Sequence, residues 1–199
     1  MKRILLASFL AAVVTFAFGA AYWMNLTKHA FLRPKDDAKV QALLKENLSS
    51  PGSYIVPDIG QEQDEFHKKA ETGPVAIMHL VPSSGPEDMG AMMGKGFVSQ
   101  WLTMFVLALV VNSSLGALPS FGDRVRFCAL VGLVGLLFID GGNMIWWHHS
   151  EKFTLFAGTY HFFSFLLAGL VIAAIVRAEE EQSAITQASA PVSQNIQST

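Results

Sequence analysis

Two ionisable side chains, Asp140 and His161, lie inside stretches of the chain that are otherwise uncharged. Asp140 is the one acidic or basic residue in 127–147, and His161 is the one histidine or charged residue in 153–176. A carboxylate in hydrocarbon costs at least about 2.5–3.5 kcal/mol on insertion scales. A facing histidine or water lowers that cost, and such pairs serve as proton relays, polar pockets or hydrogen bonds between helices.

The spacing predicts that these two side chains meet. Asp140 stands about seven residues before the end of its stretch and His161 about eight residues after the start of the next. At about 1.5 Å per helical residue both lie roughly 10–12 Å below the same surface. Asn143 lies one turn from Asp140 on the same helix face. The three form a candidate intramembrane polar site, and the alternative is a polar contact between helices worth about 0.6 kcal/mol.

A second cluster, His148, His149 and Glu151, stands in the short connection between the two stretches. A turn can bring both histidines to one ion, and His161 or Asp140 can complete a set of three or four ligands for zinc or copper. The alternative is that these histidines lie among lipid headgroups, with an apolar body and a polar tip.

Three further chemistries have weaker signals. The thioethers of Met89, Met92 and Met93 are soft ligands that suit Cu(I), although methionines also serve adaptable interfaces. A haem held by two histidines needs both at one depth, and His161 alone lies within an apolar stretch. Gly-x-Ser-x-Gly, P-loop and His-Glu-x-x-His motifs do not occur in the sequence. We therefore favour a non-enzymatic protein that holds no cofactor.

Four apolar stretches must position these residues: 4–23, 97–115, 127–147 and 153–176. Each has the length of about 20 residues that a helix needs to cross a hydrocarbon core. Charged residues make up 15% of the 199-residue chain, against roughly 25% in soluble domains. The composition predicts a mainly α, integral membrane protein, a four-span helical bundle. The net charge of −2 gives no indication of a nucleic-acid partner, and one cysteine excludes a disulfide framework.

Short basic flanks predict the orientation. Five cations fall on one side of the membrane and Lys152 alone falls in the short turn on the other; the five are Lys2, Arg3, Arg124, Arg126 and Arg177. By the positive-inside rule both termini are cytoplasmic, and residues 24–96 are extracytoplasmic. Residues 1–23 form the first transmembrane helix and act as a signal anchor; the alternative is a cleaved signal peptide.

The extracytoplasmic segment 24–96 predicts a small α+β cap. Residues 34–48 have a helical apolar face, and 53–57 and 74–81 are typical of two strands of a hairpin. A charged stretch, 61–71, separates the strands as a solvated loop or helical turn. The Gly- and Met-rich segment 85–96 predicts an adaptable link, and the polar residues 178–199 predict a disordered cytoplasmic tail.

In the order of these elements the chain resembles small bacterial inner-membrane proteins of no assigned function. The matching residues are Trp23, Gly52 to Pro57 (Gly-Ser-Tyr-Ile-Val-Pro), Gly73-Pro74 and Trp146-Trp147. The resemblance implies a location in the bacterial inner membrane and no activity. We interpret the chain as an accessory or interaction subunit that contacts the bilayer and other membrane proteins. The alternative is a small transport, proton-relay or metal/redox module centred on Asp140 and His161.

Overall fold

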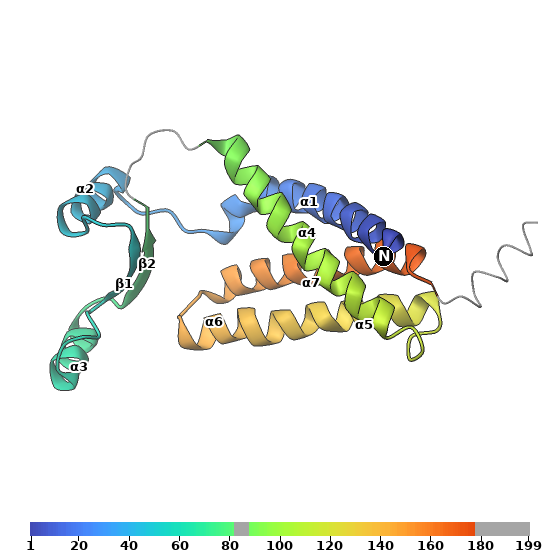
Figure 1. Ribbon diagram of the computed structural model, residues 1–199. Helices are drawn as coiled ribbons and strands as arrows, with labels where there is room; N and C mark the ends of the chain where they lie inside the picture. The colour runs from blue at the N-terminus through green and yellow to red at the C-terminus, as the bar shows by residue number, and fades with distance from the viewer. Residues whose placement is uncertain (82–87, 178–199) are drawn as a thin grey trace, which may run out of the picture. The chain divides into compact units, whose positions relative to one another are not determined.

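The computed structural model describes residues 1–81 and 88–177 and divides the chain into two compact units. One unit contains Met1–Ala30 and the chain from Met93 onward, and the other contains Phe31–Met92. The long helices of the first unit and the small hairpin of the second are labelled in Figure 1. The predicted tail, 178–199, and part of the predicted Gly/Met link lie outside the described residues.

Four long helical rods are apolar enough to cross a membrane. They are α1 (Lys2–Ala30), α4 (Met89–Ser113), a rod made of three consecutive segments, and α7 (Glu151–Ile175). The composite rod runs through α5 (Phe121–Gly135), the π-helical turn η1 (Leu136–Asp140) and α6 (Gly141–Trp146). The predicted fold class, mainly helical with four candidate spans, is confirmed.

Polar caps fix where the last two rods begin. The Ser120 hydroxyl accepts the Asp123 amide at 3.1 Å, and the Asp123 carboxylate accepts the Ser120 amide at 3.2 Å, which completes a capping box. Ser150 caps α7 by accepting the Phe153 amide at 3.2 Å. These caps satisfy amides that lack a partner at a helix start, so short turns between long apolar rods become possible.

Helix α7 is the central element of this unit, because it packs against α1 and also against α5, η1 and α6. Glycines permit the close approach of α5 and α7. A Cβ at Gly169 would lie 2.7 Å from Cβ of Cys128, and one at Gly132 would lie 2.8 Å from Cβ of Phe165. Small residues at helix interfaces are typical of membrane bundles, in which close packing replaces the hydrophobic effect.

Helix α4 packs on α1 through larger side chains. The ring of Phe9 makes edge contacts with Phe97 and Trp101, both at 5.9 Å between centroids. On other faces of the rods large apolar side chains are exposed; among them are Leu102, Leu137, Phe138, Ile139 and Leu155. An apolar exterior of this kind suits contact with lipid acyl chains.

The second unit is a small α+β segment between α1 and α4. It contains α2 (Asp37–Asn47), β1 (Gly52–Val56), α3 (Gln63–Thr72) and β2 (Ala76–Leu80). The strands pair antiparallel, from Gly52 opposite Leu80 to Val56 opposite Ala76. The structure therefore has the hairpin and the short helix that the sequence predicts. The charged stretch between the strands is the exposed helix α3, in which Glu65 and Lys69 form an ion pair at 2.6 Å.

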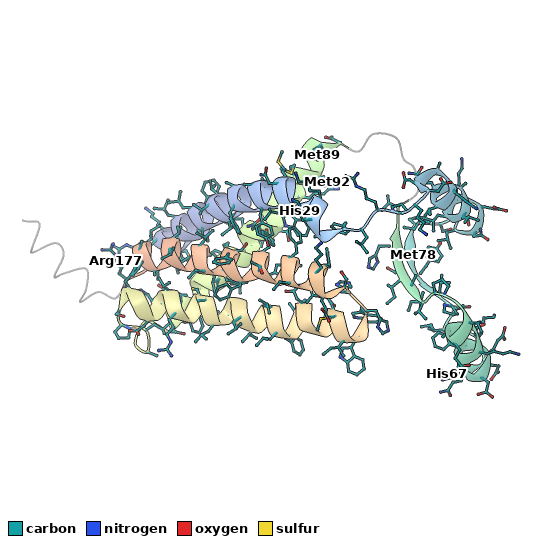
Figure 2. All side chains as sticks on the ribbon, turned by 180° about the vertical axis from the view of Figure 1, so that it is seen from behind. His29, His67, Met78, Met89, Met92 and Arg177 are labelled. Atoms are coloured by element: carbon teal, nitrogen blue, oxygen red, sulfur yellow. The ribbon has the colours of Figure 1, made fainter. Side chains whose placement is uncertain are left out.

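Two boundaries differ from those read from the sequence. Helix α1 continues to Ala30, beyond the expected end at residue 23. Helix α4 begins at Met89, so that Met89, Met92 and Met93 are exposed on its first turns rather than in an irregular link (Figure 2). Hydropathy places the apolar core of a span, whereas helical hydrogen bonding continues into the more polar flanks.

Candidate functional site

Asp140 and His161 form a hydrogen-bonded pair between the third and fourth rods. Nδ1 of His161 and Oδ2 of Asp140 are 2.7 Å apart. The side chain of Asp140 is 6% exposed, whereas that of His161 is 40% exposed. The carboxylate is therefore enclosed between helices and the imidazole covers it, with part of the ring at the surface of the bundle.

The π-helical turn directs Asp140 toward α7. The buried residues of α5 are spaced four apart and form a stripe along the helix. In an α-helix each four-residue step rotates by about 40° around the axis, so such a stripe gradually leaves the buried side. The amide of Gly141 donates to the carbonyl of Leu136, five residues back, so this turn holds more residues than an α-helical one. With more residues in the turn, each residue rotates less around the helix axis. The four-residue step from Leu136 to Asp140 therefore counteracts the rotation of about 40° and keeps the carboxylate on the buried side of the rod. Single π turns of this kind are frequent at functional sites.

Gly158 provides the space in which Leu136 packs beside the carboxylate. A Cβ at position 158 would lie 2.8 Å from Cγ of Leu136 and 3.5 Å from Oδ2 of Asp140. Gly158 is three residues before His161 on the same face of α7. The glycine and the histidine thus enclose the carboxylate from one helix, an arrangement that hydropathy does not encode.

An aromatic cluster lies beside the pair, where α1 meets α7. The Tyr22 hydroxyl donates to the carbonyl of Phe156 at 3.0 Å, and Phe18 stacks on Tyr160 with 5.9 Å between centroids. Tyr160 also contacts the ring of His161 at 5.4 Å. The ring of Tyr160 and the hydrogen bond to Asp140 together restrict the orientation of the imidazole. We did not predict this cluster, although aromatic residues spaced by three or four positions on both helices are a signal that a search for helix contacts could use.

Polar side chains also join α4 to α1. Nε2 of Gln100 donates to Oγ1 of Thr15 at 2.6 Å, and Nε1 of Trp101 donates to Oγ of Ser8 at 3.2 Å. Thr15 and Ser8 are fully buried on α1. The second and first rods are therefore joined by hydrogen bonds as well as by aromatic contacts.

Ser164 lies at about the level of Thr15. Helices α1 and α7 run antiparallel, and from the contact of Tyr22 with Phe156 both residues lie roughly two turns toward the end that carries the N-terminus. Ser164 is 5% exposed, and within the described residues its Oγ has no hydrogen-bond partner. A buried hydroxyl without a partner marks a place where water or another polar group fits.

The structure does not bring all the predicted residues into one site. Asn143 is half-buried one turn from Asp140, and its carbonyl accepts the amides of Trp147 at 3.0 Å and His149 at 3.2 Å. This part of Asn143 therefore ends the helix. The placement of its amide group as a third member of the pair stays a prediction.

The predicted metal cluster of His148, His149 and Glu151 stays a prediction. His148 has the left-handed φ of 54° that reverses the chain, the ring of His149 contacts Phe153 at 5.3 Å, and Glu151 begins α7. Within residues 1–81 and 88–177, no group of three or more His, Cys, Asp or Glu side chains is placed to hold a metal ion. The reason is geometric, since the turn directs the consecutive histidines into different surroundings.

Comparison with protein families, curated proteins and solved structures finds no match to the chain. The resemblance to small bacterial inner-membrane proteins stays a prediction. The chain has four helices with the length and apolarity of membrane spans, and a polar pair between two of them.

Proposed function

We propose that the chain is an integral protein of the bacterial inner membrane that acts as an accessory or interaction subunit and binds its partner within the membrane at His161. The observation that carries this proposal is the 40% exposure of the His161 side chain within a candidate span. Asp140 uses Nδ1 of the ring, which leaves Nε2 for a second partner. A polar nitrogen facing hydrocarbon costs free energy that a polar group on a neighbouring span would recover.

The surroundings of His161 favour a protein partner. The rods on either side expose large apolar side chains such as Phe163 on α7 and Ile139 on the third rod. An apolar surface with one polar anchor at its centre is the pattern by which spans associate specifically. The pair then sets the register of the partner helix, while the apolar surface provides the packing.

The test is complex formation by the full chain in mild detergent, with His161→Gln and Leu155→Ala as matched variants of α7. We expect the tagged wild-type chain to co-migrate with a stoichiometric membrane protein on native gels. His161→Gln should weaken that complex by about threefold to twentyfold, which corresponds to about 0.6–1.7 kcal/mol for a polar contact between spans. Leu155→Ala, which removes an exposed apolar side chain from the same helix, should keep the complex. Wild-type chain that is always monomeric, or equal complexes of all variants, would overturn the proposal.

A second candidate, a proton relay or small transport module, has its own supporting observation. Buried and half-buried polar groups extend from Asp140 and His161 through Ser164 to the level of Thr15 and Gln100, and together they come from all four rods. Waters beside the unpartnered Ser164 hydroxyl would join these groups into a path. Chains of Asp, His and hydroxyl side chains within a membrane are typical of proton pathways.

Reconstituted vesicles with an internal pH-sensitive dye test this second candidate. Under an imposed potential, Asp140→Asn and His161→Gln should each reduce proton flux to the level of empty vesicles, because each removes one exchangeable site of the pair. Leu155→Ala is the control, since it changes an exposed apolar side chain of the same helix as His161 and leaves the pair in place. Equal flux in wild-type and empty vesicles would exclude this candidate and leave the interaction role untouched.

The same proposal includes the orientation in the bilayer. We infer that both termini are cytoplasmic and that residues 24–96 are extracytoplasmic, on the support of the five cations at one side of the spans. Residues 1–23 then anchor the cap as the first span, and 97–177 supply the other three.

A further inference from the structure

A cleft of about 470 Å³ opens at the end of the bundle where α1 begins and α4 and α7 end. Its wall carries the cations Lys2 and Arg3 from the start of α1 and Arg177 from the end of α7, with Asn112 from α4. Figure 2 shows Arg177 at this end of the long helices. Among residues 1–81 and 88–177, three cations, one amide and no acidic side chain line this single hollow.

The floor of the cleft is apolar. Ile4, Leu115 and Val176 line it below the cations, and Ile4 and Val176 are 5% and 2% exposed. The site thus has a charged rim at the level of a membrane surface and an apolar base, in which Leu115 is half-buried and Ile4 and Val176 belong to the core of the bundle. This two-part lining matches an amphipathic ligand better than a small hydrophilic ion.

Arg177 is held in place by the helix that it follows. Its Nε donates to the carbonyl of Ala174 at 2.7 Å, which fixes the plane of the guanidinium near the end of α7. The two terminal nitrogens of the group can then donate to the oxygens of one phosphate. Lys2 and Arg3, on an adjacent helix, add charge from the other wall of the cleft.

We propose that this cleft binds the phosphate group of an anionic phospholipid headgroup, with the acyl chains beginning beside Leu115. Basic pockets between transmembrane helices at the cytoplasmic surface are suited to anionic headgroups. The positive-inside bias alone requires cations anywhere on these flanks, and it does not require three of them in one lined hollow with an apolar floor.

The test uses the full chain in detergent and measures bound lipid by native mass spectrometry and thermal stability with added lipid. We expect wild-type protein to retain phosphatidylglycerol or cardiolipin in preference to phosphatidylcholine. Arg3→Gln with Arg177→Gln should weaken that retention by about thirtyfold, from the loss of two surface charges. Arg126→Gln, an exposed cation at the same end of the bundle but outside the cleft, should change retention by about twofold or less.

Two more variants keep the proposal falsifiable. Arg3→Lys with Arg177→Lys preserves the charge and should keep most of the lipid binding if the glutamine variant acts through charge and not through misfolding. The acidic run Glu179 to Glu181 follows Arg177 in the sequence. Its replacement by glutamines should leave retention within about twofold; a tenfold rise would assign the cleft to the chain's own acidic run and overturn the proposal.

Added inorganic phosphate distinguishes a lipid headgroup from free phosphate as the ligand of the cleft. Phosphate at about ten millimolar should neither stabilise the protein nor displace the lipid, because it lacks the apolar part that the floor receives. Saturable binding of phosphate with no preference for anionic lipid would show a soluble phosphate ligand and overturn the lipid assignment. Equal retention of phosphatidylcholine and phosphatidylglycerol, or equal loss in the Arg126→Gln control, would overturn the site itself.

Discussion

Gly158 on α7 lies so close to Leu136 on the neighbouring rod that the Leu136 side chain occupies the place of the missing Cβ, beside the Asp140 carboxylate. A Cβ at position 158 would be 3.5 Å from Oδ2 of Asp140 and 2.8 Å from Cγ of Leu136. The pair with His161 therefore depends on a glycine that does not itself take part in any polar contact. Space, as well as charge, determines where the carboxylate can lie.

Gly158→Ala should displace Leu136 and separate the two helices at the level of the pair. We expect the free energy of unfolding to fall by about 1–3 kcal/mol, the usual cost of an added methyl group in a packed interior. Unfolding in mixed micelles, followed by helical circular dichroism, measures the effect.

Gly142→Ala is the matched control for that substitution. Nothing lies within 4 Å of a Cβ at Gly142, and alanine favours a helix over glycine by about 1 kcal/mol. Its stability should stay equal or rise. A Gly158→Ala protein as stable as wild type would show that α7 moves aside without cost, and would remove the steric part of our account.

A double-mutant cycle of Asp140→Asn and His161→Gln should give a coupling energy above the usual value for spans. Interhelical hydrogen bonds in membranes average about 0.6 kcal/mol and reach about 1.7 kcal/mol. We expect a value near the upper limit, because the 2.7 Å contact encloses a carboxylate that is 6% exposed. Unfolding of the four proteins in mixed micelles measures it, and a coupling energy near zero would mean that solvent screens the pair.

The sequence indicates the depth of Asp140 and His161, because residue counts along two helices joined by a short turn place them at one level. It also indicates the hairpin partners, since the β-rich pieces at 53–57 and 74–81 flank a charged stretch. It does not indicate the π turn, which depends on hydrogen bonding from Gly141 to Leu136. Nor does it indicate that Gly158 faces Asp140. The first is a change of hydrogen bonding within one rod and the second is a contact between two helices, and hydropathy along one helix records neither.

The cluster at 148–151 is a second case in which the sequence does not determine side-chain geometry. Its residue types are those of a metal site, but the spacing of residues within a turn does not determine where their side chains point. The left-handed conformation of His148 and the contact of His149 with Phe153 decide those directions. Composition therefore names candidates, and backbone geometry selects among them.

Ser164→Ala should maintain or raise the stability of the protein. The Ser164 hydroxyl is buried and, in the described part of the chain, has no hydrogen-bond partner, which costs about 1–3 kcal/mol in a dry interior. Thr15→Val is the contrasting variant, because it removes the acceptor of Gln100 and should destabilise by about 1 kcal/mol. Micelle unfolding compares the two. A Ser164→Ala protein that is less stable than wild type would indicate bound water at this level and would favour the proton-relay candidate.

Cysteine labelling tests the orientation that the basic flanks predict. Ser49→Cys places a thiol in the exposed connection between α2 and β1, and Gly116→Cys places one between α4 and α5, where a Cβ meets nothing within 4 Å. The native Cys128 is fully buried, so it contributes little background. In intact bacterial spheroplasts a membrane-impermeant maleimide should label Ser49→Cys and spare Gly116→Cys, and permeabilised cells should show both. The reverse pattern would place the basic flanks outside and contradict the positive-inside assignment. Labelling of both thiols in intact spheroplasts would place both connections on the same side of the membrane. That result would contradict four spans, because α4 must cross the membrane between the two connections.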